Sequence, residues 1–206
     1  ETRFVTVIEA YEGKRVVEEI ERLKPIKDDA GAMAVAVKVK VPGRTDYIVS
    51  SLDPTVEVRF EDDIAFKGRY GVISFDGDEF LGAKLVSTSY LKIGDISYEN
   101  PKPEYKGKIV DFDKGMVIEG KLYVDVPLPT DGSLIGLQIH IKNRGERDAS
   151  YPIESVERVG DGTRISVGKN TFVKSYNEKD KSLIYNFKEG DEFYIPLPQD
   201  VKAEEI

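Results

Sequence analysis

The chain has 206 residues and no cysteine, so disulfide bonds and thiolate chemistry play no part in its stability or activity. Charged residues make up 33% of the sequence and the net charge is −8, which argues against nucleic acid, because a polyanion requires a basic face on its partner. No apolar run is long enough to cross a membrane, so no membrane insertion is expected.

Alternation of apolar and polar residues predicts strands through most of the first hundred residues. These strands are expected at 4–8, 32–41, 47–49, 56–60, 71–75, 80–87 and 96–98. The small alanines in 32–41 indicate close packing on one face of that strand. Glycine–aspartate pairs are expected at the turns, since glycine adopts a positive φ without strain. These pairs lie at 76–77, 94–95, 131–132, 161–162 and 190–191.

The segment from Lys14 to Lys24 is ambiguous. Val16, Val17, Ile20 and Leu23 fall on one face of a helix, which by periodicity alone indicates a short helix. The family resemblance described below instead favours a strand with a bulge, and we expect the strand.

The two prolines at 101 and 103 are expected to separate two domains, because proline removes backbone donors and interrupts a sheet. Alternation then resumes, with strands expected at 106–112, 116–118, 121–126, 137–141, 151–159, 164–167 and 193–195. The polar tail from 199 to 206 is expected to be frayed. The predicted fold is therefore all-β: an antiparallel β-sandwich in 1–100 and a smaller C-terminal sandwich or barrel-like unit in 101–206.

Four stretches carry a resemblance to a known family: ETRFVTVIEAYEG at the start, DYIVSSLDPTVEVRFEDDIAFKGR from Asp46 to Arg69, the YGVISF that follows it, and YLKIGDISYE. Their order resembles the all-β C-terminal portion of heparinase II/III-type polysaccharide lyases. In those enzymes an α-helical toroid supplies much of the catalytic machinery, and no toroid is present here. The resemblance implies upstream catalytic domains in the same polypeptide, and a bacterial protein that is secreted or displayed on the cell surface.

Catalytic residues are not predicted. Lyase chemistry needs a base and an acid, usually tyrosine and histidine, and His140 is the chain's single histidine. Its place in LQIHIKN indicates an exposed strand residue, since a metal site would need further ligands. No cofactor is expected, although the turn carboxylates Asp76, Asp78 and Glu79 form a candidate calcium site. The acidic run 61–63 is expected to be a solvated turn, and Lys102, Lys106 and Lys108 are expected to be solvated strand ends.

Carbohydrate binding remains open because β-sandwich modules hold sugars against aromatic rings. Five tyrosines of the second half are candidates, unless they are ordinary amphipathic strand residues. They are Tyr105, Tyr123, Tyr176, Tyr185 and Tyr194.

Three functions compete. The chain is either a non-catalytic C-terminal region that supports the catalytic domains of a lyase, an autonomous carbohydrate-binding module, or, least favoured, an independent enzyme. A supporting domain would expose an apolar surface to its partner, whereas a binding module would present a groove with exposed aromatic rings. A homodimer is also expected to form through an exposed sheet edge near 4–8, because an unpaired edge is a template for association.

Overall fold

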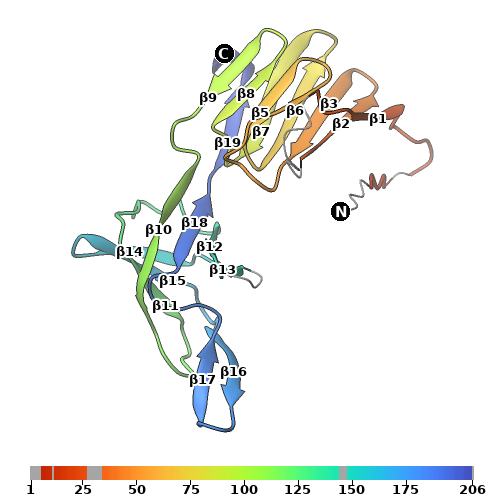
Figure 1. Ribbon diagram of the computed structural model, residues 1–206. Helices are drawn as coiled ribbons and strands as arrows, with labels where there is room; N and C mark the ends of the chain where they lie inside the picture. Colours follow the sequence, from red (N-terminus) through yellow and green to blue (C-terminus); the bar gives the residue numbers. More distant parts are fainter. Residues whose placement is uncertain (1–5, 11, 27–33, 144–147, 206) are drawn as a thin grey trace. The chain divides into compact units, whose positions relative to one another are not determined.

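The computed structural model describes residues 6–10, 12–26, 34–143 and 148–205, and these residues are almost entirely β-structure (Figure 1). The one helix in the described part of the chain is a 3-10 turn, Ala203–Glu205. No described helix has the length and apolar character needed to span a membrane. The chain divides into two compact units, one formed by Glu1–Pro103 with Pro198–Ile206 and the other by Glu104–Leu197.

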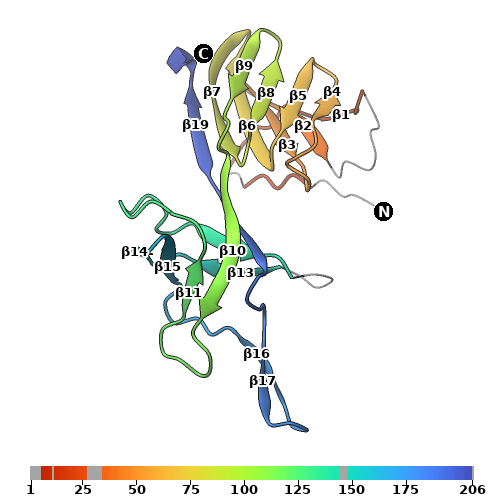
Figure 2. The same ribbon diagram turned by 60° about the vertical axis from the view of Figure 1, so that its left-hand side comes forward.

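The first unit is a sandwich of two antiparallel sheets (Figure 2). The six-stranded sheet has the order β1-β2-β3-β6-β7-β19, with β1 Glu19–Leu23, β2 Val35–Val41, β3 Arg44–Ser50, β6 Tyr70–Asp76, β7 Glu79–Val86 and β19 Pro198–Lys202. The four-stranded sheet has the order β4-β5-β8-β9, with β4 Val58–Phe60, β5 Ile64–Lys67, β8 Tyr90–Ile93 and β9 Ile96–Glu99.

A single apolar core lies between these two sheets. The six-stranded sheet contributes residues such as Val49, Ile73 and Leu85, and the four-stranded sheet contributes Phe66 and Leu91, all almost fully buried. Inward and outward side chains alternate along each strand, which is the origin of the period-two pattern in the sequence. The structure confirms the predicted all-β sandwich class.

The ambiguous segment forms a strand and not a helix. β1 pairs antiparallel with β2 in continuous register, with Ile20 opposite Val39 and Leu23 opposite Ala36, so the predicted bulge is absent. Leu23 is buried, whereas Val16 and Ile20 are about half exposed, so the apolar residues do not form one buried helical face. Pairing with a distant strand overrides the local helical pattern.

The predicted first strand at 4–8 is not observed in the described part of this segment. Positions 4 and 5 lie outside the described residues, and 6–8 have no regular structure. Ile8 is 88% exposed, so it contributes nothing to the core. The edge of the six-stranded sheet on this side is therefore β1.

The C-terminal tail is also ordered, contrary to the expected fraying. β19 pairs with β7 through five residues, and Val201 is buried in the sandwich core. The side-chain amide of Gln199 accepts a hydrogen bond from Thr88 N at 3.2 Å and donates one to Thr88 O at 3.1 Å. The strand Pro198–Lys202, which the sequence analysis assigns to the second domain, thus completes the sheet of the first unit.

The second unit contains a seven-stranded sheet, in the order β13-β12-β18-β10-β11-β15-β14, and a separate hairpin. The sheet strands are β10 Glu104–Phe112, β11 Lys121–Val124, β12 Gln138–Ile141, β13 Ala149–Pro152, β14 Ser155–Val159, β15 Gly162–Ser166 and β18 Glu192–Pro196. The hairpin consists of β16 Val173–Asn177 and β17 Ser182–Tyr185, and it extends away from the sheet (Figure 1).

This sheet curls around a second core without closing into a barrel. The first half of β10 pairs with β18 and its second half with β11, and a register shift lies between Ile109 and Asp111. At the other side, Ile153 N donates to Leu137 O and Glu154 N to Ser166 O, so this short segment links the two halves. Phe112, Tyr151, Phe172, Tyr185 and Phe187 form the aromatic part of the core through edge-on or tilted ring contacts.

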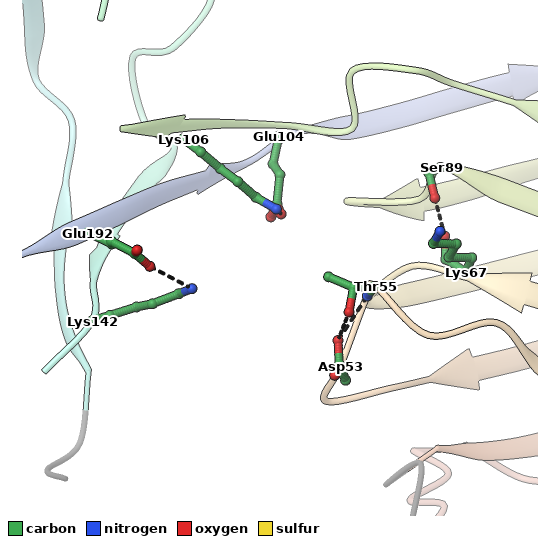
Figure 3. A network of polar contacts seen from close by, with 8 residues as sticks. All are labelled: Asp53, Thr55, Lys67, Ser89, Glu104, Lys106, Lys142 and Glu192. Carbon is green, nitrogen blue, oxygen red and sulfur yellow. Dashed lines mark hydrogen bonds and ion pairs between the residues drawn. The ribbon is translucent and has the colours of Figure 1, made fainter. Parts of the chain in front are cut away.

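Two local predictions in this region are wrong. Residues 116–118 form no strand, and Met116 and Ile118 are more than 80% exposed. In the turn between β14 and β15 the positive φ belongs to Gly160 and not to Gly162. In the first unit a turn forms at Asp53, where Thr55 donates from both its backbone N and its Oγ1 to Asp53 Oδ1 (Figure 3).

Candidate functional site

Four hairpin turns of the first unit meet at one end of the sandwich. They follow β2, β4, β6 and β8, and the antiparallel register places them together: Thr45 is opposite Phe75, and Ile64 is opposite Ile93. A cleft of 670 Å3 opens between the sheets at this end. Its polar lining includes Lys38, Lys40, Thr45, Asp62, Asp78 and Asp95, and its apolar lining is Tyr47, Phe75, Ile93 and Ile96.

A lysine–aspartate pair joins the two sheets within this cleft. Lys38 Nζ lies 2.6 Å from Asp62 Oδ2, and the two side chains are 19% and 35% exposed. The hydrogen bond to Asp62 raises the pKa of Lys38, with a further contribution from Tyr47, while partial burial acts in the opposite direction. Lys38 is therefore firmly protonated, which suits a hydrogen-bond donor and not a general base.

The turn that carries Asp62 is conformationally restrained. Asp62 and Asp63 both have positive φ values, 62° and 52°, which aspartate tolerates better than most residues. The carboxylate of Asp62 accepts a hydrogen bond from Lys38 on β2, and that of Asp63 accepts one from Lys92 Nζ on β8 at 3.1 Å. Both carboxylates are therefore anchored to neighbouring strands. The acidic run 61–63 is thus more than a solvated turn, since one of its carboxylates lines the cleft.

Aromatic rings form the wall of the cleft on the six-stranded sheet. Tyr47 and Phe75 meet edge to face with centroids 5.9 Å apart, and Phe75 contacts the buried Phe80 at 5.6 Å. Lys38 Nζ lies 5.2 Å from the centre of the Tyr47 ring. The rings are held by the core behind them, so the wall is fixed before any ligand arrives.

The second lysine of the cleft is also paired. Lys40 Nζ lies 2.5 Å from Glu19 Oε2 on β1, and this contact lowers the pKa of Glu19. Both cleft lysines therefore already have a carboxylate partner, and the exposed Asp78 and Asp95 stand at the neighbouring turns.

The candidate calcium residues lie in the turn between β6 and β7. Asp76 ends β6, Glu79 begins β7, and all three side chains, including that of Asp78, are exposed. Gly77 has the positive φ expected of the turn. Within the described part of the chain, no group of three or more His, Cys, Asp or Glu side chains is arranged to hold a metal ion.

The five candidate tyrosines are spread over the second unit in different environments. Tyr105 and Tyr185 pack against its core, and Tyr185 OH accepts a hydrogen bond from Gly115 N at 3.0 Å. Tyr123 hydrogen-bonds to Arg164 on a neighbouring strand. Tyr176 is 54% exposed on the β16–β17 hairpin. Tyr194 stacks on His140, with ring centroids 4.9 Å apart and planes inclined by 8°.

His140 is half-buried and not fully exposed, because the Tyr194 ring covers one of its faces. Charged side chains surround this pair on β10, β12 and β18. Lys142, directly after β12, points toward Glu192, with Nζ and Oε2 3.3 Å apart, and Lys106 lies 2.6 Å from Glu104 (Figure 3). These lysines are engaged with carboxylates and do not form a purely basic patch.

The outer face of the six-stranded sheet carries an apolar band. Six outward residues of β2, β3, β6 and β7 form what we call the apolar strip: Val35, Val37, Ile48, Tyr70, Val72 and Val86. Val37 is 5% exposed and Tyr70 is 42% exposed. Polar residues such as Ser50 and Lys84 share this face, so the strip is an apolar band on a face of mixed character.

The pKa shifts of the carboxylates and lysines arise from structural hydrogen bonds and ion pairs. The carboxylates of Glu9, Glu19, Glu119 and Asp131 have lowered pKa values, chiefly because of hydrogen bonds to neighbouring N–H, hydroxyl or ammonium groups. Lys38 and Lys114 have raised values, chiefly because of bonds to Asp62 and Glu189. None of these shifted groups moves toward neutral pH, where a general acid or base works best.

Sequence reasoning missed the cleft. Its signal was the alternating strand 32–41, in which Lys38 and Lys40 are in phase with the inward Ala34 and Ala36. Lysines on the inward face of a sandwich strand indicate that the core ends and a polar opening begins. The pattern could not show that Tyr47, Asp62 and Asp95 would meet them there.

Residues 17–95 match the family model of the endo-acting ulvan lyase C-terminal domain. This range includes β1 through β8 of the first unit and covers less than half of the chain. No curated protein and no solved structure matches the chain. This match supports the predicted resemblance to the C-terminal portion of a polysaccharide lyase.

Proposed function

We propose that this chain is a non-catalytic, all-β C-terminal region of a polysaccharide lyase, which supports the catalytic domains and contacts polysaccharide. The match of residues 17–95 to the endo-acting ulvan lyase C-terminal domain carries the proposal. The heparinase II/III-like character of the parent enzyme, its bacterial origin and its secretion are parts of the same proposal.

The apolar strip favours a supporting role. An exposed apolar face covered by a partner domain gains roughly 25 cal/mol for each Å2 removed from water, so a few hundred Å2 correspond to several kcal/mol. Tyr70 remains 42% exposed at this strip, and Leu81, further along β7, is 46% exposed. The partner we propose is an upstream domain of the same polypeptide.

A second candidate function is an autonomous carbohydrate-binding module. The observation that favours it is the cleft of the first unit, where aromatic rings and hydrogen-bonding side chains line one opening. The two functions do not exclude each other, since the cleft lies at the end of the sandwich and the strip on its outer face.

Self-association through a sheet edge stays a prediction. The strand concerned is β1, whose exposed residues Glu19, Glu21 and Arg22 are charged and oppose unspecific edge pairing. Sedimentation velocity over a concentration series measures it, and a single monomeric species at all concentrations would contradict the dimer.

The test of the proposed function is retention in affinity gels that contain ulvan, run with and without calcium. We expect the chain to be retained and to release no unsaturated uronate products, which are followed by their ultraviolet absorbance. Retention that requires calcium would support the site at Asp76, Asp78 and Glu79. Product formation that disappears in His140→Ala would overturn the non-catalytic assignment, and absence of retention on every polysaccharide tried would overturn polysaccharide contact.

A further inference from the structure

We propose that the cleft of the first unit binds an uncharged sugar unit of a polysaccharide, and that it rejects uronate and sulfate groups. This inference rests on the proposed contact with polysaccharide and specifies where and what the domain binds. In a polymer that carries uncharged residues between its uronates, the cleft would hold an uncharged residue.

The charges of the cleft oppose an anionic ligand. Lys38 is bonded to Asp62 and Lys40 to Glu19, so a ligand carboxylate would have to displace a carboxylate of the protein. Asp78 and Asp95 are exposed at the adjacent turns. A second anion within a few ångströms of these groups is repelled, and the repulsion is stronger where the walls exclude water.

The same side chains suit sugar hydroxyl groups. A hydroxyl both donates and accepts, so it can bridge the protonated Lys38 and the carboxylate of Asp62 without breaking their pairing. Thr45 at the cleft offers a further donor and acceptor. Hydrogen bonds to charged groups are stronger than those between neutral groups. A charged group that has lost its water and finds no partner is costly to the complex.

The apolar walls of the cleft suit the faces of a sugar ring, which carry carbon-bound hydrogens. Tyr47 and Phe75 stand on the six-stranded sheet, and Ile96 stands on the four-stranded sheet, so carbon-bound hydrogens of a ring would be packed from both sides. The cleft volume of 670 Å3 lies within the range of about 300–1,000 Å3 that is typical of small-molecule sites.

The experiment uses pairs of polymers that share a backbone and differ in whether their substituents are charged. The whole chain is run in gels containing polygalacturonate or its fully methyl-esterified form, and dextran sulfate or dextran. The variant Lys38→Met removes a hydrogen-bond donor of the cleft, and Tyr47→Ala removes an aromatic ring from its wall. Lys84→Ala is the matched control, because Lys84 lies on the same six-stranded sheet with its side chain 79% exposed. Thermal melting verifies that each variant folds.

We expect an uncharged polymer to retain the wild type and Lys84→Ala, and its charged counterpart to retain neither. Lys38→Met should weaken retention by about tenfold or more, as expected for the loss of one hydrogen bond to a charged group. Tyr47→Ala should also weaken retention, because the sugar ring loses an apolar wall of the cleft. The double variant Asp78→Lys, Asp95→Lys changes exposed turn residues and should gain salt-sensitive retention by polygalacturonate.

Two outcomes overturn the inference alone: preferential retention by the charged polymers, or retention by an uncharged polymer that Lys38→Met and Tyr47→Ala leave unchanged although both fold. Failure of all polymers, ulvan included, to retain the wild type overturns the inference together with the proposed polysaccharide contact. The two failures are therefore distinguishable.

Discussion

The closing strand β19 offers the sharpest test of the fold, because its neighbouring residues point in opposite directions. Val201 is 3% exposed in the sandwich core opposite Ala83. Asp200 points outward, and its Oδ2 lies 3.1 Å from Lys84 Nζ, with the two side chains 65% and 79% exposed. Val201→Ala and Asp200→Ala thus compare a core contact with a surface contact on one strand.

The expected magnitudes differ clearly. Val201→Ala removes buried carbon worth about 0.8 kcal/mol per methylene and leaves a small cavity, so we expect a loss of about 2 kcal/mol in the free energy of unfolding. Asp200→Ala removes an exposed ion pair, for which the expected loss is at most about 1 kcal/mol.

Hydrogen exchange combined with urea titration separates the two units. Peptides from β6 and β7 should lose protection at a urea concentration roughly 1 M lower in Val201→Ala, since slopes are typically about 1–3 kcal/mol per M. Peptides from β12 and β18 should be unchanged. Equal effects of the two variants, or a shift confined to β12 and β18, would show that β19 does not complete the first sandwich.

Two further predictions concern backbone fit and pH. Gly68→Ala should destabilise the first unit by about 1–3 kcal/mol, because a Cβ there would lie 2.8 Å from Thr88 Cα; an unchanged melting temperature would contradict this contact. Thermal melts should also show that stability falls between about pH 5 and pH 3. A carboxylate whose pKa is lowered in the folded state stabilises the fold at any pH above its unfolded pKa. This contribution is lost as the pH falls through the folded pKa. These carboxylates are Glu9, Glu19, Glu119 and Asp131, and stability that is flat or rising on acidification would contradict their pairing.

The sequence predicts the interior strands of the six-stranded sheet well. β2, β3, β6 and β7 appear as alternating runs because their inward residues form one core, and Gly77 and Gly94 take the positive φ that their turns require. In the four-stranded sheet the pattern predicts the edge strands β4 and β9 and misses the interior strands β5 and β8. In the six-stranded sheet it fails at the two edges. The periodicity of β1 by itself indicates a helix, and the segment is a strand because it pairs with β2. The strand β19 carries a single buried residue, Val201, in a polar tail.

The candidate site is harder to predict because it is built from turns that are distant in sequence. Asp62, Asp78 and Asp95 each look like ordinary turn residues, and only the register of two sheets brings them to one opening. The tyrosines of the second half were singled out by composition, yet Tyr105 and Tyr185 serve the core. Composition identifies which residues can contact a sugar, whereas topology decides which of them share a surface.

The first unit presents two different surfaces, and this separation has a consequence for function. The cleft is formed by turns at the end of the sandwich, and the apolar strip by outward residues of β2, β3, β6 and β7. A partner domain seated on the strip need not cover Lys38 or Tyr47, because these side chains lie on the opposite, inward face of β2 and β3. Changes at Tyr70 should therefore affect association with the catalytic domains, whereas changes at Lys38 should affect retention by polysaccharide. If both sets of variants altered both properties equally, a supporting role and a binding role could not be assigned to separate surfaces.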